Sequence, residues 1–230
     1  MELPDILTEK NVEKAAELVR RYYLVPDSKT GLLGTGSHFD TWAADDAAAH
    51  PNEITDSDLV AVSLLTVSVS GKAAMGLRAA KAGIISLLTD IPNNRSLHSV
   101  PAEQRELIIG DGSPARELWT LLVGKRNAKW GIGPTTASKI LARKRPQLLP
   151  IFDTVIRDLV GKQNTRDQWR NWHALLTAGP GLPERLERIH KRSTVEQPLT
   201  HLRIMDVVLW MHGKEQGFVG GRSRKSPVAP

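Results

Sequence analysis

The chain has 230 residues with 31 Lys and Arg, 25 Asp and Glu and no Cys, which gives a net charge of +6. The absence of Cys excludes disulfides, thiolate metal sites and thiol nucleophiles. No stretch approaches the ~18 apolar residues of a membrane-spanning helix, and the first residues lack the basic and apolar regions of a secretion signal. We therefore expect a cytoplasmic protein that is not in a membrane.

The charge is divided unevenly along the chain. Residues 1–110 contain ten Lys and Arg against fifteen Asp and Glu, a net −5, whereas residues 111–230 contain twenty-one against ten, a net +11. A concentrated basic half indicates a polyanionic partner such as a phosphate backbone. The alternative is a solvated basic face without a partner.

Helical periodicity dominates the first half of the chain. Apolar residues recur at helical spacing over 8–25, with Thr8 as the expected N-cap. A loop rich in Gly follows over 31–42. Thr55 and Asp58 have the spacing of a capping box, and the apolar run 59–69 predicts a helix buried all round. Further helices are expected within 72–90 and 101–109.

The segment 113–161 carries the most informative pattern. Apolar residues share one face of a helix over 114–123, and Gly124 is the expected stop. A hairpin at about 124–134 contains Gly131-Ile132-Gly133, and Pro134 fits the first turn of the next helix, which ends in Arg143-Lys144-Arg145-Pro146. An extended piece then delivers Asp153 to the start of another helix. Backbone N–H groups at such a glycine turn favour binding of one phosphate.

This combination resembles the helix-hairpin-helix DNA glycosylase superfamily, which contains endonuclease III and the adenine glycosylases. The resemblance covers the motif Gly-Ile-Gly-x-x-Thr-Ala-x-x-Ile-Leu and the later Pro-Ile-x-Asp-Thr-x-x-Arg, and more faintly 54–76. In that family an Asp follows the second hairpin Gly at about the interval between Gly133 and Asp153. The resemblance implies an all-α, two-lobed helical bundle.

Three departures from the family pattern narrow what the resemblance implies. Bifunctional members have a lyase Lys two residues after the second hairpin Gly, where this chain has Thr135. The Gln that probes the duplex in many members is absent, with Ser68 near its place, and the Cys ligands of the iron–sulfur members are missing. The resemblance is therefore to cluster-free, monofunctional branches, with no cofactor and no metal.

The resemblance implies a catalytic role for Asp153, although Asp is also a favoured N-cap and this role needs no catalysis. The residues expected to contact DNA are Gly131, Gly133, Thr135, Lys139, Arg143, Lys144 and Arg145. A polar and aromatic cluster, His38, Phe39, Asp40 and Trp42, is a candidate lining for an extruded base. The alternative for that cluster is a surface turn held by its aromatic residues. One His and one Asp two residues apart are too few ligands for a metal.

Helices are also expected over 166–176, where Trp169 and Trp172 belong to the core, over 183–192, and within 198–213. We expect residues 54–148 to form the lobe with the hairpin, residues 1–53 and 149–213 to form the second lobe, and residues 214–230 to be a disordered basic tail.

The resulting hypothesis is a nucleoid-associated monomer that binds double-stranded DNA and excises a damaged base, or a modified base such as those of foreign phage DNA. In this scheme Asp153 assists the attack of water. Two alternatives remain: a helix-hairpin-helix DNA-binding protein without chemistry, and a helical protein-interaction module whose basic half meets an acidic protein.

Overall fold

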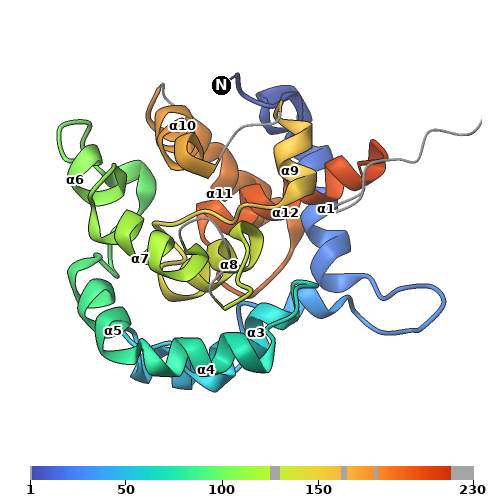
Figure 1. Ribbon diagram of the computed structural model, residues 1–230. Helices are drawn as coiled ribbons and strands as arrows, with labels where there is room; N and C mark the ends of the chain where they lie inside the picture. Colours follow the sequence, from blue (N-terminus) through green and yellow to red (C-terminus); the bar gives the residue numbers. More distant parts are fainter. Residues whose placement is uncertain (1, 125–129, 162–164, 179–180, 219–230) are drawn as a thin grey trace, which may run out of the picture.

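The computed structural model describes residues 2–124, 130–161, 165–178 and 181–218 (Figure 1). Over these residues the chain is helical and contains no strand, which confirms the all-α class. The α-helices are α1 (Val12–Leu24), α2 (Ala44–Ala49), α3 (Asp56–Ser63), α4 (Gly71–Ala79), α5 (Lys81–Asp90), α6 (Arg105–Ile109), α7 (Pro114–Val123), α8 (Pro134–Lys144), α9 (Thr154–Leu159), α10 (Thr165–Thr177), α11 (Leu182–Ser193) and α12 (His201–Glu215). Short 3-10 helices lie at Asp5–Leu7, Glu9–Asn11, Thr35–His38 and Leu97–Ser99.

The helices pack in two groups. α1 lies against α11 and α12, and α9 packs on α12, so the N-terminal helix joins the C-terminal part of the chain. α7 packs against α5 and α8, and α3 packs against α8. The two lobes expected from the sequence, with boundaries near 54 and 148, remain a prediction that is compatible with these contacts.

The start of α3 matches its sequence signature. Thr55 accepts a hydrogen bond from the Asp58 backbone N–H, and the Asp58 carboxylate accepts one from the Thr55 backbone N–H, which completes the predicted capping box. The helix is shorter than expected and ends at Ser63, because the chain turns at Thr66, whose φ is 60°. It is also not buried all round, since Val60 is 42 % exposed.

The first helix also begins later than the sequence predicts. Thr8 lies between two 3-10 turns and donates its hydroxyl to the Asp5 carbonyl at 2.6 Å instead of capping a helix. α1 then runs from Val12 to Leu24 and buries the predicted apolar face. The hydroxyl is therefore used by a tight turn before the helix.

The two helices that flank the hairpin have the predicted bounds. Ser113 caps α7, Gly124 ends it with a φ of 78°, and Pro134 opens α8 directly after Gly133. Trp130 is buried and lies over Gly76 of α4, where a Cβ would collide with the indole ring. Position 76 must be glycine because the Trp130 indole ring packs directly on the α4 backbone. Residues 125–129 of the predicted hairpin lie outside the described residues.

The C-terminal half supplies the remaining core. Trp169 and Trp172 are 1 % and 3 % exposed, which confirms that they belong to the core rather than to a base-stacking surface. Trp169 packs edge-on against Trp119 of α7. α12 runs to Glu215, so residues 214 and 215 are helical and do not belong to the tail expected over 214–230. Residues 219–230 of that expected tail lie outside the described residues.

Candidate active site

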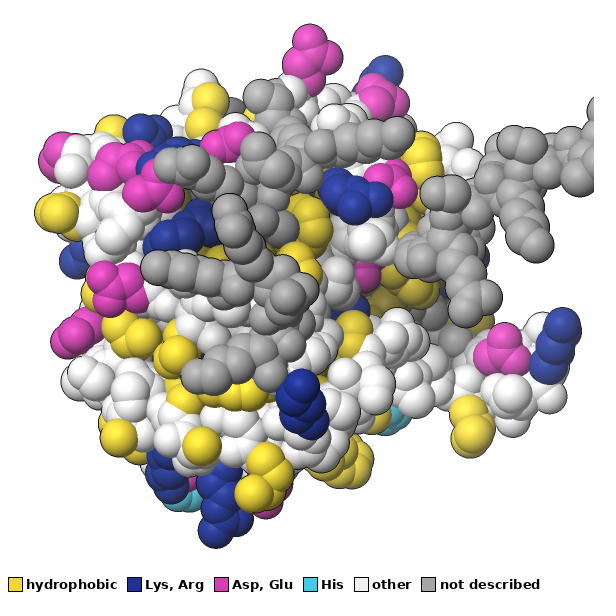
Figure 2. All heavy atoms as spheres, in the orientation of Figure 1, with side chains coloured by type: hydrophobic (Ala, Val, Ile, Leu, Met, Phe, Trp, Pro, Cys, Tyr) yellow, Lys and Arg dark blue, Asp and Glu magenta, His cyan; other side chains and the backbone are white. Residues whose placement is uncertain are grey.

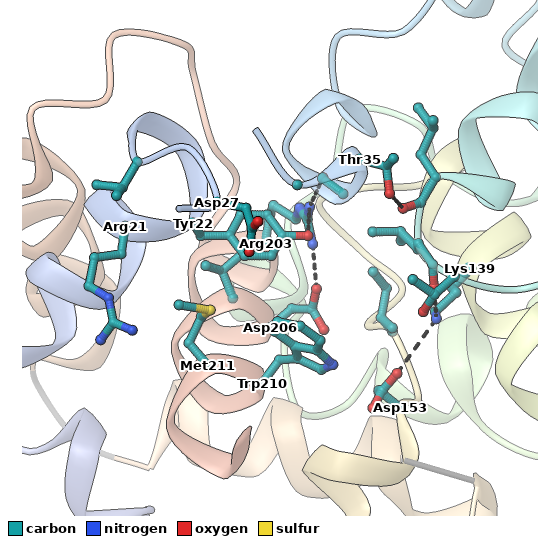
Figure 3. Close-up of a pocket in the computed structure, with 18 of the residues that line it drawn as sticks. Arg21, Tyr22, Asp27, Thr35, Lys139, Asp153, Arg203, Asp206, Trp210 and Met211 are labelled. Carbon is teal, nitrogen blue, oxygen red and sulfur yellow. Dashed lines mark hydrogen bonds and ion pairs between the residues drawn. The ribbon is translucent and has the colours of Figure 1, made fainter. Parts of the chain in front are cut away.

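A cavity of about 380 Å³ lies where α12, α1, α8 and the chain just before α9 meet (Figure 3). Its walls also include residues 34–36 and 64–66. Side chains from both helix groups line it, among them Tyr22, Lys139, Asp153, Arg203 and Asp206. Cavities of ~300–1,000 Å³ with a few convergent polar groups are the usual form of a small-ligand site in proteins.

Asp153 lies in this cavity and also caps a helix. One carboxylate oxygen accepts a hydrogen bond from the Val155 backbone N–H at 2.8 Å, and the other is 3.5 Å from the Lys139 Nζ. The Asp153 side chain is 14 % exposed. Both predicted roles are therefore compatible with its position, because capping uses one oxygen and leaves the second in the cavity.

The extended piece before Asp153 is fixed to α8 by a buried hydroxyl. Ser138 Oγ accepts a hydrogen bond from the Phe152 backbone N–H at 2.9 Å and donates to the Thr135 carbonyl at 2.9 Å. On the other side, the Gln168 side-chain amide donates to the Ile151 carbonyl at 2.8 Å. These contacts hold the carboxylate next to Lys139, which follows Ser138 in the same helix.

Lys139 is an interior residue and not a surface contact to phosphate, which corrects the sequence prediction. Its side chain is 4 % exposed, and Nζ donates to the Leu65 carbonyl at 2.7 Å and pairs with Asp153. Burial lowers the pKa of the Lys139 amine below its usual value, and the Asp153 carboxylate opposes this shift. Lys139 lies one helical turn after Thr135, so the two residues share a face of α8.

The next three predicted phosphate contacts are also buried, and the prediction for them is wrong. Arg143, Lys144 and Arg145 are 8 %, 5 % and 1 % exposed. Arg143 and Lys144 donate to the buried Asp58 carboxylate at 3.1 and 2.9 Å. A basic run at the end of a helix looked like a solvated patch, but its partner lies 85 residues earlier in the chain.

Arg145 is satisfied by backbone carbonyls instead of a carboxylate. Its guanidinium donates to the carbonyls of Pro51, Leu88 and Ile91 and to the Asn52 side chain, so it closes the end of α5. Burial lowers the pKa of Arg145 to about 10. None of these three side chains is available to a phosphate.

The hairpin glycines remain accessible. Gly131 has a φ of 78°, which favours glycine, and a Cβ added at Gly133 would meet no atom within 4 Å. Gly133 is the N-cap of α8 and offers no side chain there. Thr135 is half-buried in the first turn of that helix. The predicted phosphate contact at these three residues stays a prediction.

The predicted base-pocket residues 38–42 do not line this cavity. Phe39 is buried, while Trp42 is 43 % exposed and His38 is exposed. The backbone carbonyls of Phe39 and Trp42 accept hydrogen bonds from Arg143, which pins this segment to α8. The alternative stated above, a turn held against the body, describes this segment better. The cavity is lined instead by the residues just before it, 34–36.

Asp40 contributes to the cavity indirectly, through an arginine. Arg203 of α12 donates to the Asp40 carboxylate at 2.8 Å, to the Tyr22 hydroxyl at 3.2 Å and to the Gly36 carbonyl at 2.9 Å. Its remaining nitrogen donates to the Asp206 carboxylate at 2.5 Å. Arg203 is 5 % exposed, so this network forms a rigid wall of the cavity.

The sequence prediction missed Tyr22, Arg203, Asp206 and Trp210 as site residues. Tyr22 and Trp210 meet edge to face, with ring centroids 6.0 Å apart, and give the cavity an aromatic surface. One signal was present: Arg203 and Asp206 interrupt a run of apolar residues in the first half of α12. A buried charge in such a stripe requires a partner or a function.

Positive charge is not gathered into one patch on the described part of the face in Figure 2, where Lys and Arg side chains lie scattered, several beside Asp or Glu. On α11, Arg185 and Arg188 both pair with Glu9, at 3.0 and 2.6 Å. Part of the positive charge of residues 111–230 is therefore neutralised by ion pairs within the protein.

No group of three or more His, Cys, Asp and Glu side chains suited to a metal ion occurs among the described residues. Within the same residues, no helix is long and apolar enough to cross a bilayer.

Comparison with curated proteins and with solved structures gave no match. A family model does match residues 15–213, which include every residue of the cavity. The chain belongs to the family described as a family of unknown function, DUF6308.

Proposed function

We propose that this protein is a monofunctional DNA glycosylase, which binds double-stranded DNA and hydrolyses the N-glycosidic bond of a damaged or modified nucleotide extruded into the cavity. The observation that carries this proposal is the position of Asp153. The carboxylate oxygen that does not cap the helix faces a cavity of about 380 Å³ and pairs with a buried amine, at the family interval after a Gly-x-Gly hairpin.

The chemistry of base excision fits these groups. Cleavage of the N-glycosidic bond develops positive charge on the sugar, and a fixed carboxylate stabilises that charge and takes a proton from the attacking water. Asp153 supplies the carboxylate, and Lys139 keeps it oriented through their ion pair. Tyr22 and Trp210 supply the aromatic surface on which an extruded base stacks.

Phosphate binding is assigned to the hairpin backbone and not to the basic run of α8. N–H groups at the start of a helix attract an anion without any side chain. Gly131 and Gly133 leave that approach open, because neither carries a Cβ. This assignment survives the burial of Lys139, Arg143, Lys144 and Arg145, which removes these four from the proposed contact.

A lyase step needs an amine that attacks the sugar, and neither Thr135 nor Lys139 supplies a free one. Thr135 has no amine, and the Lys139 Nζ is occupied by the Leu65 carbonyl and the Asp153 carboxylate. An attack by Lys139 on the sugar requires that it first release both partners and a proton. The expected product is therefore an intact abasic site.

The test is incubation with duplexes that carry uracil, hypoxanthine, 7-methylguanine or 5-hydroxymethylcytosine, followed by alkaline cleavage of abasic sites. The proposal predicts strand breaks that require alkali for at least one duplex. A covalent adduct trapped by borohydride, and lost in Lys139→Met, would overturn the monofunctional assignment. Duplex binding that depends on the hairpin, with no excision from any substrate, would favour a DNA-binding protein without chemistry.

A further inference from the structure

A second carboxyl faces the cavity, and the mechanism above does not use it. Asp206 lies on α12 with its side chain 11 % exposed, and one oxygen accepts a hydrogen bond from Arg203 at 2.5 Å. No described residue donates a hydrogen bond to its other oxygen, although the side chain lines the cavity (Figure 3). A buried carboxyl with a free oxygen is positioned to meet a ligand rather than to complete the fold.

Arg203 fixes where that free oxygen points. The guanidinium is itself held by Asp40, Tyr22 and the Gly36 carbonyl, so it cannot follow a moving partner. Asp206 lies one helical turn after Arg203, and the short contact between them restricts its rotamer. Arg203 is thus a positioning residue for Asp206.

The two carboxyls of the cavity have different surroundings. Asp153 lies beside the Lys139 amine and a helix N-terminus, whereas the largely buried Asp206 side chain lies in the second turn of α12, beside Arg203. Burial raises the pKa of the Asp206 carboxyl to about 6; Arg203 and Lys139 oppose this shift, and Asp153 adds to it. The charged and titratable groups around Asp206 come from four elements: Arg203 on its own helix, Tyr22 on α1, Lys139 on α8 and Asp153 at the start of α9. Asp40 lies behind Arg203 and accepts a hydrogen bond from it, and Arg21 and Asp27 also line the cavity. A carboxyl whose burial favours its protonated form, placed across the cavity from a carboxylate beside an amine, suits the role of acid to the other's role of base.

We propose that Asp206 is a second catalytic residue, the general acid that protonates the base as it leaves. This inference rests on the proposed glycosylase function. As the bond between C1′ and the base nitrogen breaks, its electron pair passes to the base, and the Asp206 proton joins that base. Water adds to C1′, and its proton passes to Asp153. One water is consumed, its hydroxyl ending on the sugar and one hydrogen on the base, and exchange with solvent returns the proton from Asp153 to Asp206.

The assignment names a class of substrate. A base that is cationic before cleavage, such as 7-methylguanine or 3-methyladenine, leaves as a neutral molecule without a proton donor. A base that is neutral in the duplex leaves as an anion unless it is protonated. Protonation by Asp206 therefore speeds the excision of neutral bases only, and we expect neutral bases to be the substrates.

The experiment compares single-turnover excision from duplexes that carry neutral bases, uracil and hypoxanthine, with excision from duplexes that carry the cationic 7-methylguanine and 3-methyladenine. Wild type, Asp206→Asn and Asp158→Asn are measured between pH 5 and 8. Asn keeps an acceptor for Arg203, so melting temperature reports whether the variant folds. Asp158 is the matched control, a carboxyl of α9 that pairs with Arg157 and does not line the cavity.

The proposal predicts that wild type excises neutral bases with a rate that falls about tenfold per pH unit above pH ~6. Asp206→Asn should lose about 10²–10⁴-fold on these bases and also lose that pH dependence, while Asp158→Asn should match wild type. Equal rates for wild type and Asp206→Asn, or activity restricted to the cationic bases, would overturn the role of Asp206 and leave the glycosylase proposal standing. Excision of no base at any pH would overturn both.

Discussion

Removing the Asp58 carboxylate should leave two charges buried without their partner. Asp58 is 1 % exposed, and its oxygens accept hydrogen bonds from Arg143 at 3.1 Å and Lys144 at 2.9 Å. Breaking a buried ion pair by removing one partner costs about 3–5 kcal/mol. For a chain of 230 residues each kcal/mol lowers the melting temperature by ~2–4 °C, so Asp58→Ala should melt about 6–20 °C below wild type.

The assay is thermal unfolding followed by circular dichroism, with Asp56→Ala as the control. Asp56 lies in the same first turn of α3 but is exposed, so its loss removes only a helix-dipole interaction of about 0.3–1 kcal/mol. If Asp58→Ala melts within a few degrees of Asp56→Ala, Arg143 and Lys144 do not depend on Asp58. Arg143 and Lys144 would then again be candidates for a contact with DNA.

Three further predictions concern stability and binding. Arg145→Lys should lose about 2–4 kcal/mol in urea unfolding, because an ammonium cannot reach the Leu88 and Ile91 carbonyls and the other acceptors together. Relative to Asp206→Asn, wild type should be most stable below pH ~4 and lose up to about 3 kcal/mol as pH rises through 6, since a carboxyl with a raised pKa is destabilising once ionised; parallel stability curves would contradict this. Gly133→Glu should weaken duplex binding for all sequences and reduce its salt dependence, as measured by fluorescence anisotropy, whereas unchanged affinity would exclude the hairpin.

Local features of the fold were predictable because local chemistry determines them. The bounds of α7 and α8 follow from Ser113, Gly124 and Pro134, which start or stop helices whatever packs around them. The capping box of α3 is likewise contained within four residues. The position of Asp153 at the start of α9 belongs to the same class of feature.

The fate of the basic run was not predictable from its neighbours. Whether Arg143, Lys144 and Arg145 face solvent or the core depends on acceptors that fold onto α8 from residues 39–58 and 88–91. A single Asp at position 58 looks like an N-terminal helix residue and gives no sign that it also neutralises two cations.

The cavity walls were missed for a similar reason. Tyr22 and Asp206 are separated by most of the chain, and they come together only because α1 packs against α12. Sequence spacing places residues on one helix face but does not pair faces of distant helices. The one sign of this cavity wall in the sequence was the presence of Arg203 and Asp206 among the apolar residues of α12.

Single-turnover excision with Asp153→Asn, on whichever duplex wild type cleaves, measures whether Asp153 acts in base excision. Asn retains an acceptor for the Val155 N–H, so folding should be near native, and duplex affinity should be equal or higher because a negative charge is gone. Asp158→Asn, in the same helix and paired with Arg157, is the control and should match wild type. Asp153→Asn should lose about 10²–10³-fold or more in excision rate. Excision at the wild-type rate would make Asp153 a helix cap only and contradict the mechanism.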